Sequence, residues 1–160
     1  MKIYITSDHA GFALKSELVP FLEKNGFDVT DCGPEKYIHD DDYPDYISLV
    51  AEKISEESYR GVASVNSVKM EVAGIVIGWS GQGEAVVANR FSNVRCAVFY
   101  GGSKHVLTLS RQHNDANILS LGAHFLSTED AEKACLLWLS TEFSGEERHV
   151  RRINKIETYD

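Results

Sequence analysis

Short apolar runs alternate along the chain with longer stretches in which apolar residues recur every three or four positions. Runs of that length are typical of strands buried in a sheet, and the longer stretches have the period of amphipathic helices. The predicted strands cover residues 2–7, 27–31, 73–77, 95–99 and 117–121. The predicted helices cover residues 11–25, 43–57, 84–90, 103–112, 128–139 and 146–158.

Alternation of strands with helices predicts βαβ units, which build a parallel sheet covered by helices on both faces. The expected fold class is therefore α/β. Pro20 falls inside the first predicted helix, and we expect a kink or a restart there. Residues 58–71 fit no element well, and we expect a flexible excursion or a small hairpin in that stretch.

Length and charge narrow the choice of function. We expect a single domain over residues 1–160, long enough to bury a core without a disulfide or metal staple. The chain has 16 basic and 24 acidic residues, a net charge of −8, which argues against nucleic-acid or membrane partners. The first residues are too polar for a signal peptide, and no apolar run reaches about 18 residues. We therefore expect a cytoplasmic protein.

Neither the cysteines nor the histidines predict a metal site. The cysteines are scattered, form no CxxC pair and are odd in number, which argues against a disulfide framework: Cys32, Cys96 and Cys135. Several histidines lack the spacing of metal ligands, and there is no HExxH motif: His39, His105 and His124. We expect no metal.

A glycine-rich segment, residues 78–84, follows the predicted strand 73–77 and opens a predicted helix. Glycines let the backbone approach a ligand closely, and a helix N-terminus presents free N–H groups to an anion. The dinucleotide fingerprint fails because Val86 stands where a third Gly or Ala is needed, and no phosphate-loop lysine follows. The segment predicts an anion-stabilising turn with Ser80 and Glu84 as its side-chain chemistry. A plain strand-to-helix turn with an acidic residue in the first helical turn explains the residues equally well.

A second candidate is the basic cluster Arg148, Arg151 and Arg152, whose spacing places all three on one face of the last predicted helix. Guanidinium groups grouped in this way suit a phosphate. A solvated basic helix end is the commoner meaning of such a run. The anion site is favoured slightly, because this is the one dense basic cluster in an acidic chain.

Ligands in open α/β sheets gather beyond the carboxyl ends of the strands. We assign three segments to that edge: residues 8–9, 78–84 and the region of 113–114. His113 lies beside two amides and suits general acid–base catalysis near neutral pH, although a capped helix end is the simpler interpretation. Asp8 and His9 could equally be a helix N-cap and its neighbour.

Five separated motifs occur in one order along the chain. They are Ser-Asp-His-Ala-Gly at 7–11, Asp-Tyr-Pro-Asp-Tyr at 42–46, the 78–84 loop with Ala-Asn-Arg at 88–90, the string 110–117, and Arg148-His149 with Arg152. Their order and spacing resemble ribose-5-phosphate isomerase B and its galactose-6-phosphate isomerase relatives. The resemblance covers nearly the whole chain except residues 58–71, a stretch that is longer than usual for the family.

This resemblance implies a Rossmann-like three-layer α/β/α sandwich with a mainly parallel five-stranded sheet. It implies a homodimer, with a tetramer as the alternative, and active sites at the subunit interface. The implied activity is aldose–ketose isomerisation of ribose 5-phosphate and ribulose 5-phosphate through an enediolate, without a cofactor. Many members use a cysteine base at the position of Gly78, whereas another branch has Ser-Gly-x-Gly-Glu, which matches residues 80–84. By that match Glu84 is the base.

The resemblance also assigns the other site residues. The remaining catalytic residues are His113 for ring opening, Ser80 for the enediolate charge and Asp8 for the sugar hydroxyls. The substrate-binding residues are His9, Tyr43, Trp79, Gly81, Gln82, Gly83, Asn114, Arg148 and Arg152, of which His9 and the two arginines bind phosphate.

Two departures and one conflict leave alternatives open. Trp79 replaces a residue that is usually glycine, and His124 stands where relatives carry an arginine that contacts phosphate from the partner subunit. Because of both changes, other substrates remain alternatives: a tetrose 4-phosphate, allose 6-phosphate or galactose 6-phosphate. A non-catalytic sugar-phosphate binding protein is a further alternative, and a nucleotide-binding module lacks a fingerprint. For Glu84, a helix N-terminus lowers the pKa and burial raises it, and the sequence leaves the balance open.

Overall fold

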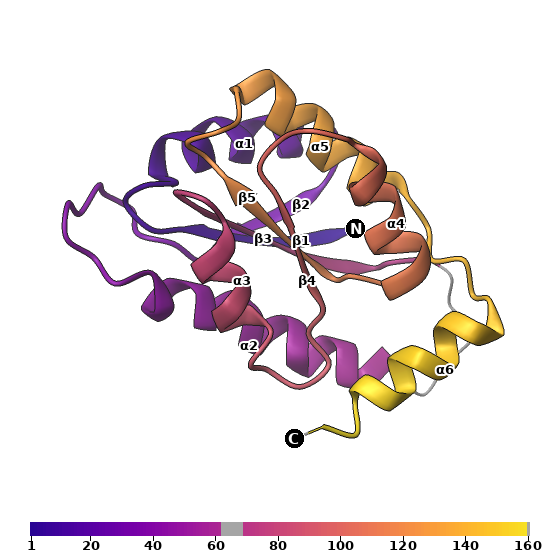
Figure 1. The fold of residues 1–160 in the computed structure, drawn as a ribbon. Helices are drawn as coiled ribbons and strands as arrows, with labels where there is room; N and C mark the ends of the chain where they lie inside the picture. The colour runs from indigo at the N-terminus through magenta and orange to yellow at the C-terminus, as the bar shows by residue number, and fades with distance from the viewer. Residues whose placement is uncertain (62–68, 160) are drawn as a thin grey trace.

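The computed structural model describes residues 1–61 and 69–159. In these residues five strands form one sheet, every neighbouring pair parallel, in the order β2-β1-β3-β5-β4 (Figure 1). The strands are β1 Lys2–Ser7, β2 Asp28–Asp31, β3 Val72–Gly78, β4 Cys96–Phe99 and β5 Ile118–Gly122. The helices are α1 Phe12–Lys24, α2 Tyr43–Gly61, α3 Gln82–Ala88, α4 His105–Asn114, α5 Thr128–Ser140 and α6 Glu147–Ile156.

The three central strands are buried on both faces, which explains their continuous apolar runs. Successive side chains alternate between two cores. Ile3 and Ile5 of β1 face the core under α1, α4 and α5, while Tyr4 between them faces the core under α2 and α3. Ile75 and Ile77 of β3 lie in the first core, and Val76 lies in the second. These two layers of helices confirm the predicted α/β/α sandwich and its five-stranded sheet (Figure 1).

Two local predictions need correction. At Pro20 the helix does not restart, since α1 is one helix from Phe12 to Lys24 and Leu18 and Leu22 on either side of the proline are both fully buried. Tertiary packing therefore compensates for the helical hydrogen bond that the proline removes. The alternative, a kink, stays a prediction. The second helix is longer than predicted and ends at Gly61, so part of the expected excursion is helical. Residues 62–68 of that excursion lie outside the described residues.

Because all the strands are parallel, their carboxyl ends lie together along one edge of the sheet, the carboxyl edge, and their amino ends lie along the opposite one, the amino edge. At the carboxyl edge, β1 leads into Asp8 and β3 leads into the 78–84 loop. Helix α4 connects β4 to β5 and runs back across the sheet, so it ends with His113 and Asn114 at the amino edge. The assignment of 113–114 to the carboxyl edge is therefore wrong. None of the helices in the described part of the chain has the length and apolarity needed to cross a membrane.

Candidate active site

Asp8 closes the turn that follows β1. Its side chain is buried, and its Oδ1 accepts a hydrogen bond from the Gly11 N–H at 3.0 Å. Position 11 has to be glycine, because a Cβ there would overlap the Ile77 carbonyl group of β3. This close approach brings the Asp8 turn against the end of β3, and the Asp8 carboxylate acts electrostatically on Glu84. The two predicted catalytic carboxyl groups therefore lie together.

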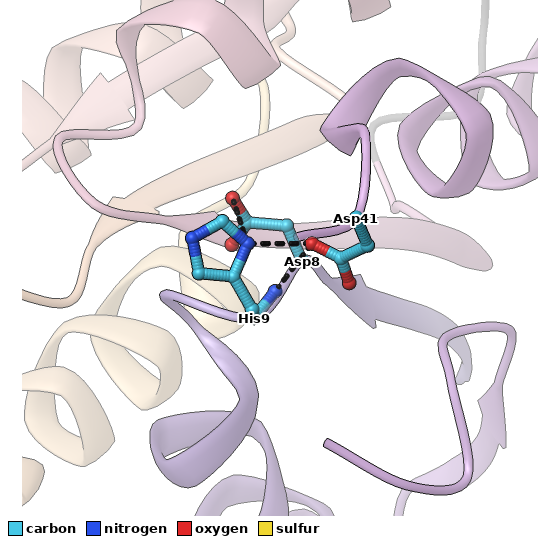
Figure 2. Close-up of side chains that lie close together, drawn as sticks. All are labelled: Asp8, His9 and Asp41. Carbon is cyan, nitrogen blue, oxygen red and sulfur yellow. Dashed lines mark hydrogen bonds and ion pairs between the residues drawn. The ribbon is translucent and has the colours of Figure 1, made fainter. Parts of the chain in front are cut away.

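His9 is held by an aspartate that sequence analysis did not single out. The Asp41 Oδ1 lies 2.6 Å from His9 Nδ1 and also accepts the His9 backbone N–H at 3.1 Å (Figure 2). The Asp41 hydrogen bond raises the pKa of His9, aided by the charges of Asp8 and Asp40 and opposed by desolvation. A cationic imidazole at a strand end suits an anionic group of a ligand. The only signal for Asp41 was the acidic triplet 40–42, which does not reveal a partner 32 residues away.

The same cluster has the composition of a metal site. Asp8, His9 and Asp41 each offer one ligand atom, and these atoms all lie within 4.8 Å of one another. Two carboxylates and an imidazole suit a divalent cation. However, the 2.6 Å spacing is that of a charge-assisted hydrogen bond, which satisfies His9 Nδ1 without an ion. The expectation of no metal stays a prediction.

The glycine-rich loop is fixed to the neighbouring strand β5. The Gly78 carbonyl accepts the Ala123 N–H at 2.8 Å, and the Gly81 carbonyl accepts the buried Ser120 hydroxyl at 2.7 Å. Gly81 has a φ of +76°, a left-handed conformation that favours glycine. Because a trans peptide points its N–H away from its carbonyl, the Ser120 bond directs the Gln82 N–H outward, where it donates to Ser80 Oγ at 3.3 Å. Sequence analysis did not identify Ser120.

Glu84 lies in the first turn of α3, and only 4% of it is exposed. Its carboxyl group packs directly on the Cα of Gly78, so that a Cβ at position 78 would overlap it. Burial raises the pKa of Glu84, its own backbone N–H lowers it, and the charge of Asp8 raises it further. The net direction is upward. Desolvation therefore outweighs the helix N-terminus, which answers the question that the sequence left open.

Tyr43 also belongs to the carboxyl-edge group. It is the first residue of α2 and lies beside the loop, since a Cβ on Gly83 would come within 3.0 Å of the Tyr43 ring.

The three cysteines are not activated: burial raises the pKa of each thiol. A thiolate base is therefore disfavoured, and a buried carboxylate is the stronger candidate.

A second group of predicted site residues lies at the amino edge. His113 of α4 packs against His149 of α6, with ring centroids 4.3 Å apart. His149 is 2% exposed, and its Nδ1 lies 2.8 Å from Ser144 Oγ. Burial, together with the charges of His113, Arg148 and Arg152, lowers the pKa of His149 and favours a neutral ring. Sequence analysis quoted His149 as part of a motif but assigned it no role.

The arginines follow on the same helix. Arg148 and Arg152 of α6 are exposed, and the Arg148 guanidinium pairs with Glu146 at 2.7 Å. Helix α6 lies at the end of the sheet where β1 begins, away from α3 at the other end (Figure 1). The structure therefore does not bring all the predicted residues together. Asp8, His9, Tyr43, Ser80 and Glu84 form one group, and the residues of α4 and α6 form another.

Comparison with known proteins identifies the family of this chain. A family model described as Ribose/Galactose Isomerase matches residues 3–156. The chain belongs to the Ribose/Galactose Isomerase family. Ribose-5-phosphate isomerase B from Mycolicibacterium paratuberculosis is 35% identical over 160 residues, covering 100% of this chain and 92% of the relative.

Solved structures of family members agree with this placement. Ribose-5-phosphate isomerase B from Mycoplasma genitalium, with bound ribulose-5-phosphate, superposes with a TM-score of 0.86 at 34% identity, covering 99% of this chain and 95% of that one. The protein from Clostridium thermocellum gives a TM-score of 0.84 at 36% identity, with 99% and 96% covered. The predicted family is therefore confirmed, and with it the class of enzyme, an isomerase. The roles of individual residues stay predictions.

Proposed function

We propose that this member of the Ribose/Galactose Isomerase family interconverts ribose 5-phosphate and ribulose 5-phosphate in the cytoplasm, without a cofactor, using Glu84 as its base. The observation that carries the proposal is the buried Glu84 carboxyl group packed on Gly78. At the position where many relatives have a cysteine, this chain leaves only the space that the carboxyl group fills. Relatives named ribose-5-phosphate isomerase B support the choice of substrate.

The proton transfer follows from the chemistry of the loop. Glu84 removes the proton from C2 of the open-chain aldose and returns it to C1, while the hydroxyl proton moves from O2 to O1, which yields the ketose through an enediolate. A carboxyl group with a raised pKa is a better base once ionised than an ordinary one, because its pKa is closer to the operating pH. The Ser80 hydroxyl and the N–H groups at the start of α3 stabilise the negative charge that develops on the enediolate oxygens.

Ring opening and binding use the remaining predicted residues. His113 moves the proton that opens the furanose ring, Asn114 binds the reacting oxygens and Asp8 binds the sugar hydroxyls. His9, whose pKa is raised by the hydrogen bond to Asp41, binds the phosphate together with Arg148 and Arg152. Phosphate binding far from the reacting carbons orients the substrate, and orientation lowers the barrier of the chemical step.

These roles require a second copy of the chain. Strand β3 has seven residues and spans about 20 Å, so the residues before and after the strands of one protomer are too far apart to share one sugar phosphate. In a homodimer the amino-edge group of one protomer completes the carboxyl-edge group of its partner. The separation of the two groups within one chain supports active sites at the subunit interface.

The first test is a coupled assay of ribose 5-phosphate conversion with and without Glu84→Gln. The substitution keeps the shape of the side chain and removes the base, so we expect kcat to fall by about 10²–10⁴-fold. Glu52→Gln on α2, an exposed glutamate, is the matched control and retains full activity. Activity that survives Glu84→Gln would overturn the base assignment.

Assays of the parent protein on several sugar phosphates distinguish the proposed substrate from its alternatives, and an enzyme from a binding protein. An active parent on ribose 5-phosphate supports the proposed substrate, whereas preference for erythrose 4-phosphate, allose 6-phosphate or galactose 6-phosphate keeps the chemistry and changes the sugar. A parent that binds sugar phosphates but turns over none of them is a binding protein.

A further inference from the structure

Arg95, the residue before β4, contacts both parts of the amino-edge group. Its Nε donates to the Asn114 carbonyl at 3.0 Å and to the Asp115 carbonyl at 3.1 Å. Its Nη2 pairs with the Asp115 carboxylate at 3.2 Å, and its Nη1 pairs with Glu157, the residue after α6, at 2.9 Å. One guanidinium group, on a side chain that is 14% exposed, therefore joins the end of α4 to the end of α6.

The turn at the end of α4 has a backbone conformation that needs support. Asp115 has a φ of +45°, a left-handed conformation that residues other than glycine adopt at a cost. Its carboxylate binds two arginines: Oδ1 accepts from the buried Arg111 at 2.8 Å, and Oδ2 accepts from Arg95 at 3.2 Å. Because this turn begins directly after Asn114, its path sets how the end of α4, with His113 and Asn114, is presented.

Helix α6 has a single buried side chain. Of its ten residues, all within the described part of the chain, only His149 is buried. It packs on His113, and just before the helix the Ser144 N–H donates to the Gln112 carbonyl of α4 at 3.2 Å. Both contacts lie at the start of α6, and contacts at one end of a helix do not by themselves fix where its other end lies.

Glu157 supplies the contact at the other end of α6. Its Oε1 binds Arg95 at 2.9 Å, and its Oε2 accepts the Asn93 N–H at 3.1 Å. The Glu157 side chain is 26% exposed, so salt screens this ion pair less than a pair on the open surface. Helix α6 is thus held at both ends, and Arg148 and Arg152 lie between them.

We propose that Arg95 is a positioning residue, which holds the end of α4 and helix α6 at a fixed distance from each other. This inference rests on the proposed function, in which His113 acts on the sugar while Arg148 and Arg152 bind its phosphate. Both parts have to act on one substrate molecule at the same time. A misplacement of about 1 Å can slow a reaction about a hundredfold, so a rigid link between them favours catalysis.

Glu157→Ala tests the link, because it releases α6 and leaves the bonds between Arg95 and α4 in place. We expect KM for ribose 5-phosphate to rise about tenfold, the effect of one hydrogen bond between charged groups, while kcat changes less than about twofold. The inhibition constant of inorganic phosphate rises by the same factor, because the released helix binds the phosphate. A merely structural defect that lowers the amount of folded enzyme would reduce the apparent kcat and leave KM unchanged.

Arg95→Met removes both sides of the link. We expect KM to rise at least as much as in Glu157→Ala, and kcat to fall about tenfold as well, because the turn after Asn114 is released. Adding Glu157→Ala to Arg95→Met raises KM by less than about twofold further, since the two residues act through one contact. Two independent effects would multiply instead.

Two controls accompany these variants. Glu157→Gln retains an acceptor oxygen for Arg95, so its KM lies closer to that of the parent than the KM of Glu157→Ala does. Glu129→Ala removes an exposed ion pair with Lys133 on α5 and leaves both KM and kcat unchanged.

A KM and a phosphate inhibition constant that change less than about twofold in Glu157→Ala would overturn the positioning role of Arg95. Glu157→Ala alone decides the test if Arg95→Met does not fold. A parent that turns over no sugar phosphate would contradict the proposed function instead. The stabilisation of the parent and of Glu157→Ala by inorganic phosphate, measured in melting curves, would then still compare their phosphate binding.

Discussion

The carboxyl group of Glu84 is buried, although the proposed role as a base requires its charged form. Burial raises its pKa, so the folded protein holds the Glu84 proton more tightly than the unfolded chain does. A side chain placed for catalysis in this way costs stability, because the charged form prefers water. The same burial suits the proposed catalytic role, because a carboxylate with a raised pKa is a stronger base than an exposed one.

This conflict predicts how Glu84→Gln changes thermal stability with pH. For an acid whose pKa is raised by folding, stability is highest below the unfolded pKa and is lost as the pH rises through the folded pKa. Glutamine has no charge to bury, so the variant melts at a higher temperature than the parent at neutral pH. The difference shrinks as the pH falls through the raised pKa of Glu84 and is smallest below about pH 4.5, the ordinary value for glutamate. Melting curves of both proteins from pH 4 to pH 8, roughly the range in which a raised carboxyl pKa lies, measure this. A constant difference across that range would contradict the shifted pKa.

At the scale of elements, the loops that follow β3 and β5 act as one unit. Backbone hydrogen bonds join Gly78 to Ala123 and Trp79 to His124, and Ser120 inside β5 bonds the Gly81 carbonyl. The 78–84 loop is thus supported by hydrogen bonds to the regular strand β5 and the residues that follow it. Ser120 is fully buried beneath the loop, and we propose that it is a positioning residue, because its hydroxyl holds the peptide between Gly81 and Gln82.

Ser120→Ala tests that support. The substitution removes one of two hydrogen bonds to the Gly81 carbonyl, which still accepts the Ala85 N–H at 3.2 Å, so the free energy of unfolding falls by about 0.5–1.5 kcal/mol. In addition, we expect kcat for ribose 5-phosphate to fall about tenfold with little change in KM, since the loop N–H groups act mainly on the enediolate. Ser16→Ala, which removes a serine-to-carbonyl bond on α1, is the control and retains kcat. A stability loss with unchanged kcat would mean that Ser120 is only structural.

The elements also show how far the sequence could predict the site. Apolar runs predicted the three central strands, because buried parallel strands carry little else, whereas β2 at the side of the sheet is mostly exposed. The glycine loop led to the prediction of Glu84. Asp41 and Ser120 were not predicted as site residues, because only the folded chain brings each one to its hydrogen-bond partner. The partners, His9 and Gly81, lie 32 and 39 residues away along the chain. His113 was assigned to the wrong edge, because proximity to a strand in sequence does not say at which end of the strand a residue lies.

At the scale of the whole molecule, the proposed site is divided into two halves at opposite ends of the strands, one at α3 and one at α6 (Figure 1). Glu84 lies in one half of the proposed site, and His113, with His149 packed on its ring, lies in the other. If a dimer joins unlike halves, each of its two sites draws Glu84 from one protomer and His113 from its partner. Defects in the two halves then fall on different sites of a mixed dimer.

Mixing two inactive variants checks this arrangement. Glu84→Gln and His113→Asn homodimers each lack one group in both sites. Unfolding and refolding an equal mixture produces hybrid dimers in which one site has both substitutions and the other has neither. With random pairing, activity recovers to about a quarter of that of the parent, because half of the dimers are hybrids and half of their sites are intact. The two variants refolded separately and then combined are the control. If Glu84 and His113 acted within one protomer, no hybrid would contain an intact site, and the refolded mixture would stay as inactive as its parts.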